Sequence, residues 1–410
     1  MTAHAAEAIM ADIAPSPPPS PQPPAQMGPA AQIGLAALSR MVFEGRDLQP
    51  VWAGLIEQAT SNLTDASAML DLATLAILTG DMAGGLGLQQ QALQRQQLYR
   101  RPAPGVANLT VLAIAAPGDM MANTPLDFLL EQASAELLTL YVVPGVGLPS
   151  ELPDHDIAFL AIGESEANRP LLQALAPILP GWPRPLLNAN ALRIAELTRD
   201  GVCTLLEDVP GLLAPKAERV DRAGLAGWSA FPIIARPIGS HAGAGLLKIE
   251  SAGEVAAYLA EQPAERFYVS PFIDYAGPDG LFRKQRIALI EGKPFLCHHA
   301  VSAHWMVHYM NAAMLESAEN RAEEARMMAT FDEDFAIRHA GAFAAMAERI
   351  GLDYFAIDCG ETRDGQLLLF EADVAMIVHD MDPPDLFPYK KPQMRKVMAA
   401  FEAMLRRSAR

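Results

Sequence analysis

The chain has 410 residues, enough for two or three domains, and hydrophobic residues make up 51% of it, so substantial cores can form. Its 31 basic and 48 acidic residues give a net charge of −17, which opposes binding to nucleic acid and to anionic membranes. An anionic substrate would therefore need a local cluster of cations or a metal ion.

The sequence shows no sign of a membrane or secreted protein. No run approaches the roughly 18 uncharged apolar residues that a membrane helix requires, and the first residues lack the basic and apolar regions of a secretory signal. The three cysteines, Cys203, Cys297 and Cys359, are widely separated and match no zinc spacing, so we interpret them as reduced thiols. We expect a cytoplasmic protein with neither a nucleic-acid nor a membrane partner.

The first hundred residues divide into a tail and a helical region. Residues 1–30 contain PSPPPSPQPP and are too rich in proline to fold alone, which predicts a disordered tail. Residues 31–100 show two helix-turn-helix units, in which Asp47 and Asp81 are 34 residues apart, the period of a tetratricopeptide repeat. The second unit resembles that repeat, whereas the first matches poorly, and a plain helical hairpin is the alternative. Such a short array must pack on its neighbour, on a protein partner or on a second copy of the chain.

Residues 101–215 alternate between strands and helices. The expected strands cover 109–115, 138–143 and 157–162, and the expected helices begin at Pro125 and Asn168. This alternation indicates an α/β layer with a mostly parallel sheet. Two further helices over 189–215 are expected to be broken at Asp200-Gly201 and at Pro210-Gly211.

The chemistry is expected in residues 216–410, beginning with a glycine loop. A strand over 231–237 contains Arg236 and runs into the loop, which carries Gly239, Ser240, Gly243 and Gly245. Such glycines let the backbone approach a ligand and direct N–H groups at phosphates. The spacing fits neither the Walker pattern nor the dinucleotide fingerprint, and another strand follows instead of a helix. The loop alone is weak evidence for nucleotide binding.

Two further stretches strengthen the case for an anionic ligand. The segment RFYVSPFIDY at 266–275 is a strand followed by a turn, in which Phe272, Ile273 and Asp274 can offer backbone groups to a base and a carboxylate to ribose. The strand over 282–290 places Lys284 and Arg286 on one face. These are the local cations that an acidic protein needs for an anionic ligand, although basic residues on a strand are often only solvated.

The stretch DYFAIDCGETRDGQLLLFEADV at 353–374 is typical of a hairpin. With Asp364-Gly365 as a two-residue turn, Asp358 lies opposite Glu371, and Asp373 shares their face. Like charges directly opposed in a sheet are destabilising, and a hard cation such as Mg²⁺ would relieve them. A solvated hairpin face is the alternative, and a three-residue or bulged turn would change the register.

The histidines cluster between 298 and 308, with His379 further on. His304 and His308 are four apart, a spacing compatible with one face of a helix, but Trp305 stands where a zinc hydrolase requires Glu. We expect His299, His304 and His308 to lie beside a substrate as hydrogen-bonding or acid–base groups, with buried structural histidines as the alternative.

The order of these pieces resembles the ATP-grasp superfamily, in its glutathione synthetase and ribosomal-protein glutamate ligase branch, over about 155–385. The resemblance rests on FPIIARPIGSHAGAG, YVSPFIDY, FRKQRIALIEGKP, FAIDCG and LLFEADV in that order. It implies an α/β fold of the ATP-grasp type over 216–410, a pre-grasp α/β layer and linker helices over 101–215, and the all-α, repeat-like region over 31–100.

The resemblance also implies roles for the residues quoted above. Arg236 would stand where a lysine usually binds the nucleotide phosphates, and the glycine loop would cover those phosphates. Phe272, Ile273 and Asp274 would border adenine and ribose. Arg286 would stabilise the acyl phosphate. The carboxylates that would hold Mg²⁺, or alternatively Mn²⁺, are Asp358, Glu371 and Asp373.

The reaction that this resemblance implies is an ATP-dependent ligation of a carboxylate to an amine through an acyl phosphate, with an amino acid, a peptide or a small carboxylic acid as substrate. Three departures leave alternatives open: Arg236 replaces lysine, Ser270-Pro271 replaces acidic residues before the hinge, and Asp373 replaces asparagine. One alternative is a nucleotide-binding regulatory protein that recruits a partner through its helices. The other is a small-molecule kinase on the same fold.

Overall fold

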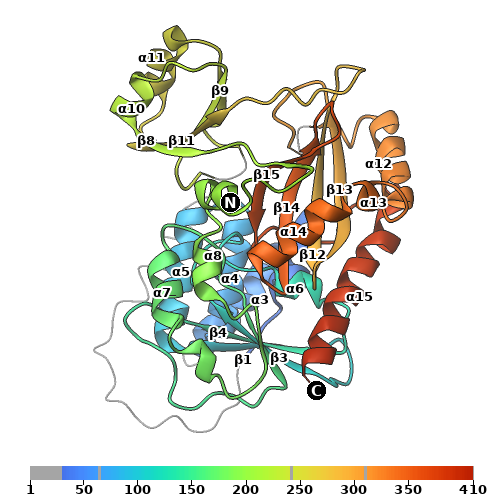
Figure 1. Ribbon diagram of the computed structural model, residues 1–410. Helices are drawn as coiled ribbons and strands as arrows, with labels where there is room; N and C mark the ends of the chain where they lie inside the picture. The colour runs from blue at the N-terminus through green and yellow to red at the C-terminus, as the bar shows by residue number, and fades with distance from the viewer. Residues whose placement is uncertain (1–29, 63–65, 241–242, 309–311, 410) are drawn as a thin grey trace.

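The computed structural model describes residues 30–62, 66–240, 243–308 and 312–409, and within these ranges it contains three β-sheets flanked by helices (Figure 1). The predicted tail over 1–30 lies outside the described residues apart from Ala30. The predicted fold class, α/β with an all-α N-terminal region, is confirmed. No helix in the described part of the chain combines the length and apolar character needed to cross a membrane.

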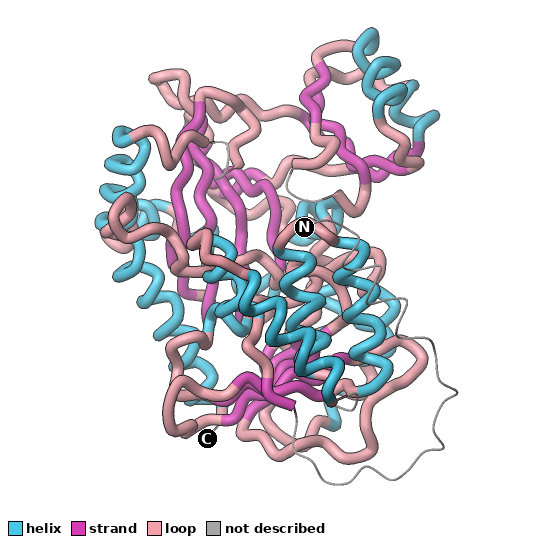
Figure 2. Tube along the Cα trace, turned by 180° about the vertical axis from the view of Figure 1, so that it is seen from behind, coloured by secondary structure: helices cyan, strands magenta, loops and turns pink. Residues whose placement is uncertain are grey.

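The N-terminal region consists of α2 (Leu35–Phe43), α3 (Gln49–Ser61), α4 (Ser67–Leu78) and α5 (Met82–Arg95). The turn before α5 forms because Gly80 adopts a φ of +99° and the side chain of Asp81 accepts a hydrogen bond from the Gly84 N–H at 2.9 Å. Leu38, Leu72 and Leu75 pack together in the core of this region. Seen from behind, the helices lie over the lower sheet of the molecule (Figure 2).

The first sheet has the strand order β1-β2-β4-β3-β5-β6. Its strands are β1 (Ala30–Ala31), β2 (Leu98–Arg101), β3 (Thr110–Ala115), β4 (Glu136–Tyr141), β5 (Ile157–Leu160) and β6 (Leu186–Leu187). The strands from β3 to β6 are parallel, as the alternating pattern predicted. The helix predicted to begin at Pro125 is shorter than expected and covers only α6 (Leu126–Leu129). All four residues of α6 are buried, so it lies within the core and has no solvent-exposed face. The next helix, α7 (Arg169–Leu175), is confirmed.

The linker helices differ from the prediction in one place that matters for the site. The segment forms α8 (Ala191–Ala195) and α9 (Arg199–Leu205), so Asp200-Gly201 lies inside a helix instead of breaking one. Thr198 is the N-cap of α9, and its side chain accepts a hydrogen bond from the Gly201 N–H at 3.0 Å. An aspartate in the first turn is favourable there because it faces the positive end of the helix dipole.

The second sheet is small and antiparallel, with the order β10-β9-β11-β8. Its elements are β8 (Glu218–Asp221), α10 (Arg222–Ala226), β9 (Ile233–Pro237), β10 (Leu247–Ile249), α11 (Ala252–Glu261) and β11 (Arg266–Pro271). It has a hydrophobic core of its own, in which Leu225, Ala235 and Phe267 are fully buried. This lobe stands apart from the rest of the fold at the top of Figure 1.

The third sheet has the order β13-β12-β14-β15-β7. Its strands are β7 (Leu212–Leu213), β12 (Phe282–Ile290), β13 (Lys293–Ser302), β14 (Tyr354–Glu361) and β15 (Leu367–Asp373), and its helices are α12 (Ala318–Thr330), α13 (Phe335–Arg338), α14 (Ala340–Ile350) and α15 (Lys390–Ser408). Side chains of the first and third sheets share continuous cores. The buried Asn188 side chain also exchanges hydrogen bonds of 2.7 and 2.9 Å with the Tyr354 backbone.

Candidate functional site

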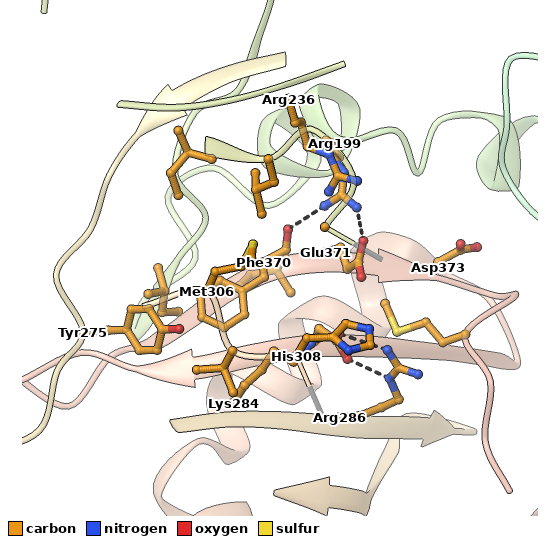
Figure 3. Close-up of a pocket in the computed structure, with 18 of the residues that line it drawn as sticks. Arg199, Arg236, Tyr275, Lys284, Arg286, Met306, His308, Phe370, Glu371 and Asp373 are labelled. Atoms are coloured by element: carbon orange, nitrogen blue, oxygen red, sulfur yellow. Dashed lines mark hydrogen bonds and ion pairs between the residues drawn. The ribbon is translucent and has the colours of Figure 1, made fainter. Parts of the chain in front are cut away.

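A cavity of about 610 Å³ lies between the small second sheet and the third sheet. Its walls come from β9, β11, β12 and β15, from the segment after β15, and from α9. Figure 3 shows that charged side chains point into this space from both sides, with Arg236 above and Glu371, Lys284 and Arg286 below. The cavity brings together most of the residues that the sequence singled out, although they are spread over more than a hundred positions.

The floor of the cavity is built by the predicted hairpin of β14 and β15. Asp358 lies directly opposite Glu371, as predicted, and Asp373 is paired with Ala356 two positions further along the same face. The predicted two-residue turn is wrong. Thr362 and Gln366 are joined by a 2.9 Å backbone hydrogen bond, which leaves three residues in the turn, with Gly365 at a φ of +81°.

The predicted register survives because a second irregularity offsets the turn. Near the turn Leu369 is paired with Cys359, whereas Glu371 is paired with Asp358, so Phe370 is an extra, bulged residue in β15. The three-residue turn moves the pairing of β14 with β15 by one residue from the predicted register. The extra residue in the bulge moves the pairing back by one residue, so the predicted register returns beyond Phe370. Without the bulge, Glu371 would not face Asp358.

Asp358 is buried and bound by two cations of β12. Arg286 donates to it from Nε at 2.8 Å and from Nη2 at 3.0 Å, and Lys284 Nζ lies 2.8 Å from Oδ2. Burial alone would raise the pKa of Asp358, but Arg286 and Lys284 outweigh burial and hold the pKa well below its usual range. Asp358 is therefore ionised, and it fixes both cations at the cavity surface.

Glu371 is paired with a cation from a different part of the fold. Arg199 of α9 contacts its carboxylate and also donates to the Phe370 carbonyl at 3.4 Å. Burial alone would raise the pKa of Glu371, but the surrounding cations, Arg199 first and then Arg236 and Lys284, together lower it. Asp373 instead accepts a hydrogen bond from the Ala375 N–H at 3.0 Å, and burial raises the pKa of Asp373 to about 7.

The three carboxylates on this face of the hairpin are candidate ligands for a metal ion. Carboxylate oxygens on one face are the donor type that Mg²⁺ prefers. Within the described residues, however, no three His, Cys, Asp or Glu side chains surround a common point. Asp358 is bound by two cations through both of its oxygens, whereas among the described residues Glu371 is paired with Arg199 alone and Asp373 with the Ala375 N–H, so Glu371 and Asp373 fit a metal ion better.

Arg236 of β9 faces the cavity from the opposite side and is only 8% exposed. Its guanidinium donates to the Ser240 hydroxyl at 3.2 Å and to the Ser240 carbonyl, and no carboxylate among the described residues forms an ion pair with it. Burial, and next the neighbouring Arg199, lower the pKa of Arg236 to about 10, so the group remains charged at neutral pH. A buried cation without an anionic partner is costly unless a ligand supplies the negative charge.

The glycine loop follows directly from β9. Gly239, Gly243 and Gly245 all have positive φ, between +66° and +79°, as a loop that turns sharply requires. Gly243 lines the cavity, and a Cβ at Gly245 would come within 2.7 Å of the Pro237 ring. Residues 241 and 242, in the middle of this loop, lie outside the described part of the chain.

The segment after β11 forms one end of the cavity. Phe272 and Ile273 line it, and the Phe272 ring contacts the Lys248 ammonium at 4.0 Å and the Trp305 ring at 5.7 Å. Asp274 does not line the cavity, and it forms a 3.1 Å ion pair with Arg363 on the surface. The apolar end is therefore present, but Asp274 points elsewhere in this conformation.

Of the three histidines expected beside a substrate, only His308 lies at the cavity. His308 lines the cavity, and burial, then Lys284, lower its pKa. His304 is exposed in a non-helical bend, where its Nδ1 accepts from Met306 N, so the two do not share a helical face. His299 is buried away from the cavity and bonds Glu323 at 3.1 Å and Gln285 at 3.0 Å. Neighbouring residues on a strand point to opposite faces, and His298, the neighbour of His299, lines the cavity instead.

His298 and His379, which belong to the histidine group noted in the sequence, also line the cavity. Arg199, Asp382 and Lys390 line it as well and were not singled out from the sequence. Lys284 also lines the cavity, and strand alternation had already placed it on the same face as Arg286. For Arg199 no local signal existed, because it reaches Glu371 across 172 positions from a different layer.

No family model and no curated protein matches the sequence. Solved structures similar to the chain include VanG D-Ala:D-Ser ligase from Enterococcus faecalis, 12% identical with a TM-score of 0.46 over 73% of this chain and 99% of that one. D-alanine–D-alanine ligase from Bacillus anthracis complexed with ATP is 12% identical, with a TM-score of 0.42 over 73% and 96%. ATP-grasp ligase PsnB with a variant precursor, Mg and ADP is 13% identical, with a TM-score of 0.40 over 73% and 99%. At such identities and TM-scores the similarity says nothing about the reaction or substrate of this chain.

Proposed function

We propose that the chain is an ATP-dependent ligase that joins a carboxylate to an amine through an acyl phosphate. The observation that carries the proposal is Arg236, a buried cation with no carboxylate partner among the described residues, facing a large cavity in a protein of net charge −17. Arg199, Lys284 and Arg286 line the same cavity. A polyphosphate is the ligand that such a set of cations suits.

The proposed roles follow from position. Arg236 and the loop of Gly239, Ser240, Gly243 and Gly245 would bind the phosphates. The apolar end at Phe272 and Ile273 would receive the base. Asp274 would have to leave Arg363 before it could bind ribose, so it is the weakest part of the proposed nucleotide site.

In the proposed reaction, an oxygen of the substrate carboxylate attacks the γ-phosphorus, and the bond from that phosphorus to the bridging oxygen of ADP breaks. The amine nitrogen then forms a bond to the acyl carbon, phosphate leaves, and the nitrogen loses a proton to solvent. Arg286 and Lys284, held rigidly by Asp358, would neutralise the charge that develops on the acyl phosphate and on the tetrahedral intermediate.

Magnesium belongs to the proposal as well. Glu371 and Asp373 would hold the ion, with Asp358 beside them, and bound Mg²⁺ would neutralise charge on the phosphates. Arg199, which contacts Glu371 in the present conformation, would then be available to a phosphate oxygen.

The remaining predictions form part of the same proposal. The nucleotide domain would cover 216–410, the pre-grasp layer 101–215 and the helical region 31–100, and the protein would act in the cytoplasm. The tetratricopeptide-like character of 31–100, and a protein partner or second copy bound there, are supported only by the helical hairpins and by the 34-residue spacing of Asp47 and Asp81.

One assay tests the proposal: release of ADP and of phosphate from Mg-ATP in the presence of pooled amino acids, peptides and small carboxylic acids. Substrate-dependent release of both products, lost in Glu371→Ala and kept in the control Arg266→Ala, supports the ligase. Arg266 is a suitable control because it lies on the neighbouring strand β11 and is mostly exposed. ADP with a stable phosphorylated product would instead indicate a kinase. Nucleotide binding without turnover under any condition would contradict both enzymes and favour the regulatory alternative.

A further inference from the structure

The segment after β15, residues 374–382, forms part of the cavity wall. Met376, Ile377, Val378, His379 and Asp382 all line the cavity. The Ile377 carbonyl also accepts a hydrogen bond from Arg286 Nη1 at 3.0 Å. This segment has no regular secondary structure, so its position depends on side-chain contacts with the elements packed on the side away from the cavity.

The support comes from the N-terminal helix α2. Arg40 Nη2 donates to Asp380 Oδ1 at 2.7 Å, across 340 positions of sequence, and the Asp380 side chain is fully buried. The same guanidinium binds Glu131, just after α6, through two hydrogen bonds of 3.0 and 2.7 Å. The other oxygen of Asp380 accepts from Gln132 at 3.3 Å. One arginine therefore joins three separate parts of the chain.

Phe43, at the end of α2, adds an aromatic contact. Its ring centroid lies 6.4 Å from that of His379, and the Phe128 ring lies 6.1 Å from His379. The His379 Nδ1 accepts a hydrogen bond from the Met381 N–H at 3.1 Å. A neutral His379 therefore carries its proton on Nε2, which is the donor that remains for a ligand.

Helix α2 is itself firmly attached, so it can act as a support. The Ile33 and Gly34 N–H groups donate to the Asp71 carboxylate of α4 at 2.7 and 3.2 Å. The Ala36 N–H donates to Asp127 of α6 at 2.6 Å. Buried charge-assisted hydrogen bonds of this kind fix the start of the helix and make its far end, with Arg40 and Phe43, a rigid platform.

We propose that α2 is part of the functional site, in which Arg40 and Phe43 are positioning residues that hold segment 374–382, and with it His379, against the cavity. The N-terminal helical region then does more than offer a surface for a partner. The positioning itself is independent of the reaction, whereas its effect on turnover rests on the proposed ligase function.

The test compares the full-length protein with Arg40→Ala, Phe43→Ala and the control Arg100→Ala. Arg100 forms a partly buried ion pair with Glu136 at 2.9 Å in the same half of the molecule, without contact to 374–382. Hydrogen exchange of the amides in 374–382 is expected to rise about tenfold or more in Arg40→Ala and to remain unchanged in Arg100→Ala. Unchanged exchange in both would overturn the proposal.

Turnover provides the second readout. The KM for the best carboxylate in the pool is expected to rise in Arg40→Ala, while the affinity for Mg-ATP measured by calorimetry stays within about twofold, and Arg40→Lys should recover part of the loss because it retains the charge. An equal loss of ATP affinity would show a general structural defect and contradict positioning. If Arg40→Ala fails to fold, Asp380→Asn replaces it. If the native protein releases no ADP at all, the ligase proposal fails alone, and hydrogen exchange still decides the role of α2.

Discussion

Asp358 and Glu371 lie directly opposite each other on adjacent strands, yet each carboxylate is neutralised by cations from a different part of the chain. Asp358 is bound by Lys284 and Arg286 of the neighbouring strand β12, and Glu371 is paired with Arg199 of α9. Opposed like charges would otherwise destabilise the hairpin. The cavity floor is thus an alternating network of charges in which each anion fixes a cation.

This network predicts a large loss of stability in Asp358→Asn. The substitution leaves Lys284 and Arg286 without their buried carboxylate, and breaking a buried ion pair from one side costs about 3–5 kcal/mol. We expect urea denaturation to show a loss of that order. The control Asp274→Asn, in an exposed ion pair with Arg363, should change the free energy of unfolding by less than about 1 kcal/mol. A loss in Asp358→Asn no larger than in the control would contradict the network.

The hairpin turn predicts a smaller effect in Gly365→Ala. Gly365 adopts a φ of +81°, a region that costs an L-residue about 1–2 kcal/mol. Nothing crowds the position of a Cβ at Gly365, so the expected loss comes from the backbone alone. Gly341, which is equally uncrowded but has no positive φ, provides the control because Gly341→Ala in α14 should be neutral or stabilising. Equal thermal stability of the two variants would show that the turn differs from the one described.

The pH dependence of stability should include a contribution from Glu323. The hydrogen bond with His299, and then the interactions with Arg283, lower the pKa of Glu323 from 4.5 to about 2. Because the folded pKa is the lower one, this stabilisation is complete above pH 4.5 and is lost as the pH falls towards 2. In Glu323→Gln the free energy of unfolding should fall less steeply than in the native protein as the pH drops from 4.5 to 2. The two slopes should differ by at most about 1.4 kcal/mol per pH unit.

The control for this measurement is Glu319→Gln, which changes an exposed carboxylate on the same helix α12. Its acid dependence should match that of the native protein. An identical slope in native protein and Glu323→Gln would show that the ion pair with Arg283 and the bond to His299 contribute nothing in solution.

The carboxylate pairing also predicts how the protein responds to magnesium. Since both Asp358 and Glu371 are paired with cations, Mg²⁺ alone should raise the melting temperature little, whereas Mg²⁺ with ATP should raise it as binding saturates. The shift with Mg-ATP should be smaller in Glu371→Ala and should disappear on chelation with EDTA. A large stabilisation by Mg²⁺ alone would mean that the three carboxylates form a metal centre without nucleotide.

The charge pattern of the hairpin could be predicted from the sequence because strand alternation and cross-strand pairing are local. Asp358, Glu371 and Asp373 do share a face. The turn and the bulge at Phe370 could not be predicted, because each depends on the other and together they leave the register unchanged. The same alternation could have shown that His298 and His299 face opposite sides of β13, so that only one of them reaches the cavity.

The parts that the sequence could not predict are those in which distant layers meet. Arg199 reaches Glu371 across 172 positions, and Arg40 reaches Asp380 across 340. Their partners depend on how the three sheets and the N-terminal helices pack, which no local pattern encodes. The spacing of His304 and His308 was compatible with one helical face, but the segment forms a bend, because spacing alone cannot distinguish a helix from a bend.

The central claim is that Arg236 binds an anionic ligand in the cavity. The most direct test is calorimetric titration of the native protein and of Arg236→Met with Mg-ATP. We predict that the variant binds at least about tenfold more weakly, a loss of about 1.4 kcal/mol or more. Its thermal stability should be unchanged or higher, because the substitution removes a buried charge without a carboxylate partner. The control Arg266→Ala should bind normally. Equal affinity of Arg236→Met and the native protein, or no binding of Mg-ATP to either, would contradict the account.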